Sequence, residues 1–165
     1  MISFVRIDNR LVHGQVIEGW LPHLKVRRVL VLDREAAQSP LTRASMGLAV
    51  PEAVALEISP DDAELRKAAD DAVPTLVLFR DIAGAFEAVR HGIRVAALNL
   101  GNIHFKDGRY PITASVFLDC EELHELEQLA REGVQIAAQA LPSEKPMGLE
   151  EIGARFRQSA SGPAC

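Results

Sequence analysis

Short runs rich in valine, isoleucine and leucine alternate along this chain with longer amphipathic stretches. Strands and helices that take turns in this way build α/β folds, in which helices cover both faces of a parallel sheet. Several runs are apolar at consecutive positions, as strands buried on both faces are. We therefore expect a single domain with an open, mainly parallel, twisted β-sheet of about six to seven strands and helices on both faces. The predicted strands span residues 2–7, 28–32, 54–58, 75–79, 95–100, 114–118 and 134–138.

Capping signals between these runs predict where helices begin and end. A hydroxyl or carboxylate side chain before a helix accepts a hydrogen bond from a backbone N–H, and a glycine after it adopts the left-handed conformation that ends the helix. Proline suits the first helical position. The predicted N-caps are Ser39 and Ser59, each followed by proline, with Asp81 and Asp119, and the predicted closing glycines are Gly92 and Gly133.

Chain length and composition favour one domain. With 165 residues, of which 48% are hydrophobic and 25% charged, the chain is long enough to bury a core and far from disordered or fibrous compositions. Residues 142–147 resemble a linker, and residues 149–157 a short helix. We expect the domain to cover residues 1–158 and to be followed by a disordered tail over residues 159–165.

Charge and motif spacing argue against several classes of protein. The 18 basic and 23 acidic residues give a formal charge of -5, so no basic field holds a nucleic acid backbone. No apolar stretch approaches the roughly 20 residues that span a bilayer, and the first residues lack the pattern of a signal peptide. Metal-ligand spacing, a P-loop and a dinucleotide glycine pattern are all missing. We expect a cytoplasmic protein that binds no nucleic acid, metal or cofactor.

The segment between the first predicted strand and the next helix, RIDNRLVHGQV over residues 6–16, is the strongest indication of function. It lies at the carboxyl end of a strand and before a helix N-terminus, where ligands and anions bind in such folds. A neutral imidazole is a nucleophile near neutral pH, because its ordinary pKa is about 6.5. The imidazole of His13 is therefore a candidate acceptor of a phosphoryl group, with Arg10 neutralising the phosphoryl oxygens.

Other residues of this segment suit contact with phosphate or with a partner protein, because the turn brings polar side chains together and glycine allows close approach of a backbone. A plainer interpretation stays open, in which Arg6 and Arg10 are solvated charges and Asp8 only caps a turn. The candidate phosphate- or partner-binding residues of the segment are Arg6, Asp8, Asn9, Gly14 and Gln15.

Two further predicted strands bring polar residues to the same edge of the sheet. Phe79 and Arg80 end the fourth strand, and Arg80 is a candidate for contact with phosphate or with an acidic face of a partner. Asp81 would repel a phosphoryl group, so a capping role is assigned to it. The loop at residues 99–109, with its asparagines and glycines, suits contact with a ligand or partner and equally suits an ordinary mobile loop.

Residues 6–16 resemble the phosphorylation-site segment of the IIB components of the mannose/fructose/sorbose family of the bacterial phosphotransferase system. The resemblance extends over roughly residues 1 to 155 and implies the following reaction. A phosphorylated IIA protein passes its phosphoryl group to His13, and His13 delivers it to a sugar bound by the membrane partners IIC and IID. The weaker points of resemblance are Trp20, Asp33, residues 78–80, residues 98–102, residues 133–134 and residues 141–142.

The resemblance also implies residue roles and a setting for the protein. His13 would be the phospho-carrier of a protein-N(pi)-phosphohistidine-sugar phosphotransferase, modified on its δ nitrogen. Arg10 matches the family arginine that assists onward transfer to sugar. A protein of this kind works in the cytoplasm, associated peripherally with the membrane transporter, and family members are often homodimers.

Two other functions stay open on the sequence alone. A regulatory phospho-switch would receive phosphate on His13 but would act by changing a protein interface, without a sugar acceptor. A small-molecule binding domain, or an enzyme that uses His13 as a general base, would need a closed pocket with a second polar group within reach.

Overall fold

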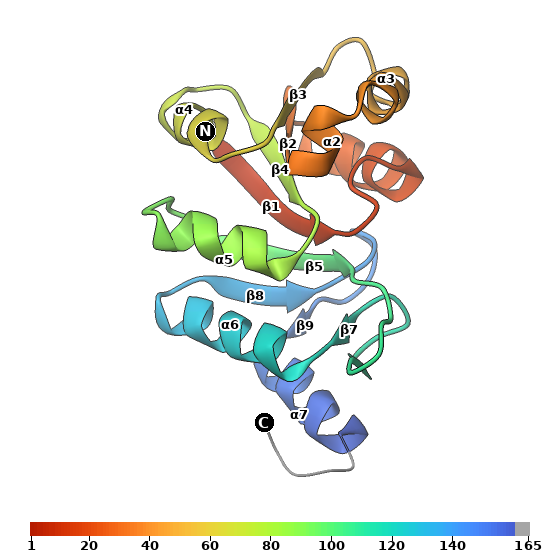
Figure 1. Ribbon diagram of the computed structural model, residues 1–165, viewed down its shortest axis with the longest axis vertical. Helices are drawn as coiled ribbons and strands as arrows, with labels where there is room; N and C mark the ends of the chain where they lie inside the picture. The colour runs from red at the N-terminus through yellow and green to blue at the C-terminus, as the bar shows by residue number, and fades with distance from the viewer. Residues whose placement is uncertain (161–165) are drawn as a thin grey trace.

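The computed structural model describes residues 1–160. A seven-stranded sheet, in the order β3-β2-β4-β1-β5-β8-β9, forms its centre (Figure 1). All pairings in this sheet are parallel except that of β8 with the edge strand β9. The predicted open, mainly parallel α/β sheet is confirmed. Its strands are β1 (Ile2–Asp8), β2 (Arg28–Leu32), β3 (Ala55–Ser59), β4 (Thr75–Phe79), β5 (Ala97–Asn102), β8 (Gln135–Ala138) and β9 (Met147–Gly148).

Helices cover both faces of the sheet and bury one apolar core on each. Along β4, Val77 and Phe79 join one core and Leu76 and Leu78 join the other, because successive side chains of a strand point to opposite faces. The first core also receives residues of α4 to α7, and the second receives residues of η1 and α1 to α3. The helices are η1 (Gln15–Trp20, a π-helix), α1 (Leu21–Leu24), α2 (Arg34–Gln38), α3 (Pro40–Ala49), α4 (Ala63–Asp70), α5 (Ile82–Arg90), α6 (Cys120–Arg131) and α7 (Leu149–Ser159).

Three predicted N-caps are confirmed. Ser39, Asp81 and Asp119 begin α3, α5 and α6, and each side chain accepts a hydrogen bond from the backbone N–H three residues further on. Gly92 and Gly133 follow the ends of α5 and α6 with φ of 89° and 95°, the left-handed conformation predicted for them.

The N-cap predicted at Ser59 is wrong. Ser59 is the last residue of β3, and its hydroxyl donates a hydrogen bond to the backbone carbonyl of Asp61. This local bond holds a turn instead of a helix start. The helix α4 begins only at Ala63, after Asp62.

The strand predicted over residues 114–118 is also wrong as part of the main sheet. Only β7 (Phe117–Leu118) is extended there, and it pairs antiparallel with β6 (Tyr110–Pro111) in a separate two-stranded sheet. The hydroxyl of Thr113 accepts hydrogen bonds from the backbone of Ser115 and Val116, so the apolar run begins in a turn.

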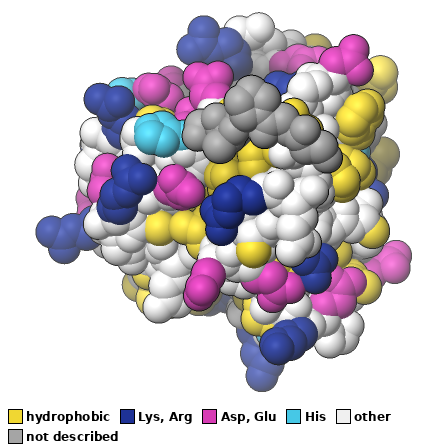
Figure 2. Space-filling view, turned by 90° about the horizontal axis from the view of Figure 1, so that it is seen from below, with side chains coloured by type: hydrophobic (Ala, Val, Ile, Leu, Met, Phe, Trp, Pro, Cys, Tyr) yellow, Lys and Arg dark blue, Asp and Glu magenta, His cyan; other side chains and the backbone are white. Residues whose placement is uncertain are grey.

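The C-terminal part differs from the predicted linker and tail. Within residues 142–148, β9 adds the antiparallel edge strand to β8. The predicted tail begins in the last residue of α7, Ser159, and residues 161–165 lie outside the described part of the chain. Among the described residues, no helix is long and apolar enough to cross a membrane. Figure 2 shows a face on which lysine and arginine side chains are interspersed with aspartate and glutamate.

Candidate functional site

The loop that carries His13 leaves the carboxyl end of β1, in the middle of the sheet, between β4 and β5. Leu11 adopts φ of 55°, unusual for a residue with a side chain, and its side chain is only 1% exposed in the core beside η1. The buried Leu11 anchors the loop. The carbonyl of His13 accepts hydrogen bonds from the backbone N–H of Val16 and Ile17, so the predicted position of His13 at a helix start is confirmed.

The buried carboxylate of Asp8 connects the charged groups of this loop. Its Oδ2 accepts hydrogen bonds from Nε2 of His13 at 2.9 Å and from Nη2 of Arg6 at 2.8 Å, and its Oδ1 accepts one from the backbone N–H of Arg10 at 3.1 Å. Burial by itself raises the pKa of Asp8, but the hydrogen bond from His13 and the charge of Arg6 outweigh burial and hold that pKa below its ordinary value. Asp8 is therefore ionised at neutral pH.

The bond to Asp8 decides which ring nitrogen of His13 can react. An ionised carboxylate only accepts hydrogen bonds, so Nε2 must carry the hydrogen. In the neutral ring Nδ1 then has the free lone pair. It is also the nitrogen that the family resemblance implies. The side chain of His13 is 15% exposed, so part of the ring reaches the surface while the carboxylate that it binds is fully buried.

The guanidinium of Arg6 is buried and contacts several other residues. Its guanidinium is 0% exposed and donates from Nη1 to Oδ1 of Asn99 at 2.6 Å and to the backbone carbonyl of Gln139 at 3.1 Å, while it lies 5.3 Å from the ring centre of Trp20. A Cβ at Gly101 would stand 1.8 Å from Cζ of Arg6, so only glycine leaves room for this arginine. The plainer interpretation of Arg6 as a solvated charge is therefore wrong, and direct contact of Arg6 with phosphate is not what this geometry favours.

Arg10 differs from Arg6 because it faces solvent. Its side chain is 40% exposed, and Nη2 donates to Oε1 of Gln15 at 2.7 Å. Around Gly14 no atom lies within 4 Å of the place that a Cβ would occupy, so the backbone there is open to an approaching group. Arg10 and Gly14, with the half-buried Gln15, thus form the rim beside His13.

Asn9 connects the loop by hydrogen bonds to residues at the ends of both neighbouring strands. Its Nδ2 donates to the backbone carbonyl of Arg80 at 2.6 Å, and its backbone N–H donates to the carbonyl of Asn102 at 2.9 Å. Its Oδ1 accepts a hydrogen bond from the backbone N–H of His104. All three bonds hold the loop in place, so we assign Asn9 to positioning the loop and not to phosphate contact.

Phe79 and Arg80, the two candidate contact residues at the end of β4, interact with other parts of the protein. Phe79 is 3% exposed and packs in the core, which leaves it no surface for a partner. Arg80 binds Asp33 through two hydrogen bonds, at 2.6 Å from Nε and 2.8 Å from Nη2, and these bonds raise the pKa of Arg80. Asp81 accepts a hydrogen bond from the N–H of Gly84 and caps α5.

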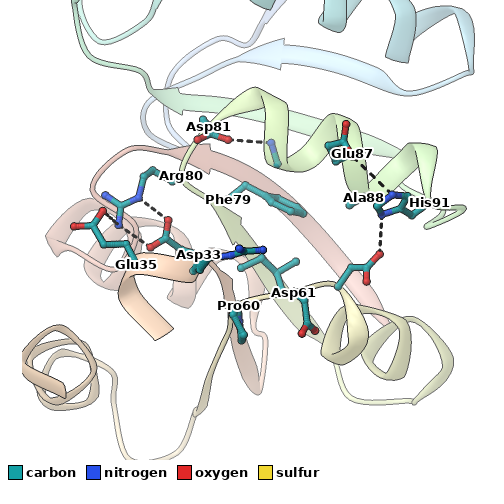
Figure 3. Close-up of a pocket in the computed structure, with 14 residues that line it drawn as sticks. Asp33, Glu35, Pro60, Asp61, Phe79, Arg80, Asp81, Glu87, Ala88 and His91 are labelled. Atoms are coloured by element: carbon teal, nitrogen blue, oxygen red, sulfur yellow. Dashed lines mark hydrogen bonds and ion pairs between the residues drawn. The ribbon is translucent and has the colours of Figure 1, made fainter. Parts of the chain in front are cut away.

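Arg80 and Asp33 line a pocket of about 550 Å³ that lies along α5, beside the ends of β2 and β4 (Figure 3). Six carboxylate residues line it against two arginines, Arg34 and Arg80, so its net negative charge disfavours a phosphoryl group. The imidazole of His91 lies within 4 Å of Asp62 and Glu87 at its far end. His13 is not among the lining residues. The carboxylate residues of the lining are Asp33, Glu35, Asp61, Asp62, Asp81 and Glu87.

Fold and site together define an α/β protein with a histidine at the carboxyl edge of its sheet, oriented by a buried carboxylate. The family described as PTS system sorbose subfamily IIB component matches residues 2–161, so the chain belongs to this family. IIB components of the phosphotransferase system accept a phosphoryl group from IIA and transfer it to a sugar, and they work with membrane IIC and IID partners.

Individual relatives agree with this assignment. The chain is 29% identical over 157 residues to the N-acetylgalactosamine-specific phosphotransferase enzyme IIB component 2 of Escherichia coli strain K12, covering 92% of this chain and 98% of the relative. It is 25% identical over 146 residues to the fructose-specific EIIB component of Bacillus subtilis strain 168, covering 87% and 90%. The crystal structure of manxB from Thermoanaerobacter tengcongensis superimposes with a TM-score of 0.86 at 26% identity, covering 94% and 96%.

Proposed function

We propose that His13 carries the phosphoryl group, on Nδ1, in a protein-N(pi)-phosphohistidine-sugar phosphotransferase reaction. The observation that supports this assignment is the 2.9 Å hydrogen bond between Nε2 of His13 and the buried carboxylate of Asp8. It fixes the ring so that the nucleophilic nitrogen is the one turned away from the protein's own carboxylate.

The transfer then needs little rearrangement. The lone pair of Nδ1 attacks the phosphorus of the phosphohistidine on IIA, the new N–P bond forms, and the N–P bond of the donor breaks. The phosphorylated ring of His13 keeps the hydrogen on Nε2 and becomes positively charged. Asp8 lies against this charge and stabilises it. In the second step a sugar hydroxyl attacks the same phosphorus, the O–P bond forms and the N–P bond to Nδ1 breaks. The hydroxyl proton passes to water or to a phosphoryl oxygen, and the ring leaves as the neutral imidazole with its hydrogen on Nε2.

Arg10 is the group that we assign to the phosphoryl oxygens. It is the exposed arginine of the loop, and its hydrogen bond to Gln15 keeps it on the rim where the phosphoryl group arrives. A guanidinium there can compensate the charge of the phosphoryl group in both steps. The open backbone at Gly14 leaves room for the active site of the partner protein.

The setting follows from the family. We propose that the protein works on the cytoplasmic side of the membrane, docked peripherally on the IIC and IID partners while the sugar accepts the phosphoryl group. Relatives named for N-acetylgalactosamine and for fructose are similarly distant, so neither name transfers to this chain. Homodimer formation stays a prediction, which the mass of the protein in solution tests directly.

The test is intact-mass spectrometry after incubation with phosphoenolpyruvate, the general phosphotransferase proteins and a matched IIA protein. We expect one acid-labile phosphoryl group on the native protein and none on His13→Ala. His104→Ala is the matched control, because this histidine is exposed on the neighbouring loop, and it should be phosphorylated like the native protein. An adduct that persists on His13→Ala would refute the assignment.

A further inference from the structure

The side-chain amide of Asn102 has a nitrogen without a partner. Within residues 1–160, two buried side-chain nitrogens make no hydrogen bond, Nη2 of Arg28 and Nδ2 of Asn102. The first lies 2.8 Å from Oδ2 of Asp71, so an ion pair compensates it. Asn102 has no such neighbour, although it is only 7% exposed. A buried donor without an acceptor is unfavourable and calls for a reason.

Asn102 lies beside the loop that carries His13. It is the last residue of β5 and pairs with Asp8, the last residue of β1, in the parallel register of the two strands. Its carbonyl accepts the hydrogen bond from the backbone N–H of Asn9. The backbone of Asn102 is therefore in direct contact with the loop that holds His13.

An irregularity in β5 turns the side chain of Asn102 to the face of the sheet where Asp8 and His13 meet. Leu100 and Ile103, three residues apart, both join the same core, which a regular strand does not allow. The register shifts between Leu100 and Asn102, so that one extra residue, Gly101, is inserted there. Gly101 faces Arg6, and paired residues share a face, so Asn102 shares that face with its partner Asp8.

The acceptors of the hydrogen-bond network around Asp8 already have donors. Oδ2 of Asp8 takes hydrogen bonds from Arg6 and His13, and Oδ1 takes one from the backbone of Arg10. The carbonyl of Gln139 is shared by Arg6 and Asn99. The unphosphorylated protein thus keeps one amide donor beside the histidine loop with nothing to bind.

We propose that the acceptor is the phosphoryl group itself, and that Asn102 donates its amide hydrogen to a phosphoryl oxygen when His13 is phosphorylated. This inference rests on the proposed function, because it needs the phosphoryl group on His13. A phosphoryl group brings strong acceptor oxygens to the loop. Rotation about the Cβ–Cγ bond of Asn102 exchanges amide nitrogen and oxygen, so the donor can turn toward the group without a change in the backbone. Asn102 would then be a catalytic residue in contact with the transferred group.

The decisive variant is Asn102→Leu, which keeps the shape of the side chain and removes the donor. The equilibrium constant for phosphoryl transfer from IIA should fall about 10- to 100-fold, because a hydrogen bond to a charged group is lost only in the phosphorylated state. The melting temperature of the unphosphorylated protein should stay the same or rise. Asn102→Asp, equal in size but negatively charged, should reduce the equilibrium constant further, because it repels the phosphoryl group.

Asn99→Leu is the matched control on the same strand. Both polar atoms of the Asn99 amide have a partner, because Oδ1 accepts from Arg6 and Nδ2 donates to the carbonyl of Gln139. This variant should therefore melt at a lower temperature without phosphate.

Two results would overturn the role of Asn102. One is a transfer equilibrium and a ³¹P chemical shift of phosphohistidine that are unchanged in Asn102→Leu. The other is a loss of unphosphorylated stability as large as that of Asn99→Leu, which would mark a purely structural residue. Failure of the proposed function shows separately, because the native protein would then acquire no phosphoryl group on His13.

Discussion

Strands β1 and β4 lie side by side and end in similar residues at the same edge of the sheet. β1 ends with Arg6 and Asp8, and β4 is followed by Arg80 and Asp81. Arg6 is 0% exposed and binds the neighbouring carboxylate of its own strand, whereas the side chain of Arg80 is 35% exposed and binds Asp33 after β2. Asp8 holds a histidine ring, and Asp81 only caps a helix.

The comparison shows that an arginine and an aspartate at a strand end do not by themselves make a reactive site. What distinguishes β1 is that its pair is buried and its carboxylate is shared with an imidazole. A buried, ionised carboxylate determines which ring nitrogen carries the hydrogen, and a solvated one would do so weakly. Substitutions at matched residues of the two strand ends should therefore have unequal effects.

The largest difference is expected between Asp8→Asn and Asp81→Asn. An amide at position 8 no longer holds the hydrogen on Nε2 of His13, so the single-turnover rate of phosphoryl transfer from IIA should fall about 100-fold or more. Asparagine is as good an N-cap as aspartate, so Asp81→Asn should transfer at the native rate. Rapid-quench measurement of both variants makes the comparison, and equal rates would show that orientation by Asp8 is unimportant.

Stability should separate the two arginines. Arg6→Met leaves the carboxylate of Asp8 buried without its main countercharge, which we expect to reduce the free energy of unfolding by about 3–5 kcal/mol. Arg80→Met breaks a partly exposed pair, so its loss should be about 1 kcal/mol or less. Urea titration of both variants measures the difference. Similar losses would mean that Arg6 is not the buried countercharge of Asp8.

A smaller effect is expected from the glycine that makes room for Arg6. Gly101→Ala places a methyl group on the guanidinium, and the resulting displacement should cost about 1–3 kcal/mol. Gly47→Ala, in α3, is the control, because no atom lies within 4 Å of its added Cβ and alanine favours a helix by up to about 1 kcal/mol. Thermal unfolding should move in opposite directions for the two variants, and a stable Gly101→Ala protein would argue against the tight fit.

The smallest effect is expected on the stability of the protein at acidic pH. The pKa of Asp8 in the folded protein is lowered, so its stabilising contribution is fully present above the ordinary aspartate pKa of about 4 and is lost as the pH falls through the lower, folded value. The free energy of unfolding should therefore decrease below about pH 4. In Asp8→Asn this decrease should be shallower. Denaturant unfolding at a series of pH values checks the slope, and an unchanged slope would mean that Asp8 does not titrate with folding.

Much of the sheet was predictable because buried parallel strands are continuous apolar runs. The strands over residues 28–32 and 75–79 match the prediction to the residue. β9 has only two residues, too few for any periodic pattern, and it forms because the chain returns beside β8. At Ser59, a hydroxyl followed by proline has the local features of a cap, but a turn bond to Asp61 is formed instead.

The geometry of the candidate site was predictable where it depends on the local order of residues, as it does for the position of His13 before a helix. It was not predictable where it depends on distant ones. Arg6 is buried because Asn99 and the carbonyl of Gln139, more than ninety residues away, receive its hydrogens. The motif around Gly101 was visible, but its meaning depends on Arg6 filling the space that a side chain would take.

We propose that Asp8 makes Nδ1 of His13 the acceptor of the phosphoryl group. The most direct test of this proposal is ¹H–¹⁵N and ³¹P NMR of the phosphorylated protein with ¹⁵N-labelled histidine. We expect a phosphorus bonded to Nδ1 of His13, with a hydrogen retained on Nε2. A phosphoryl group on Nε2, or on any other residue, would contradict it.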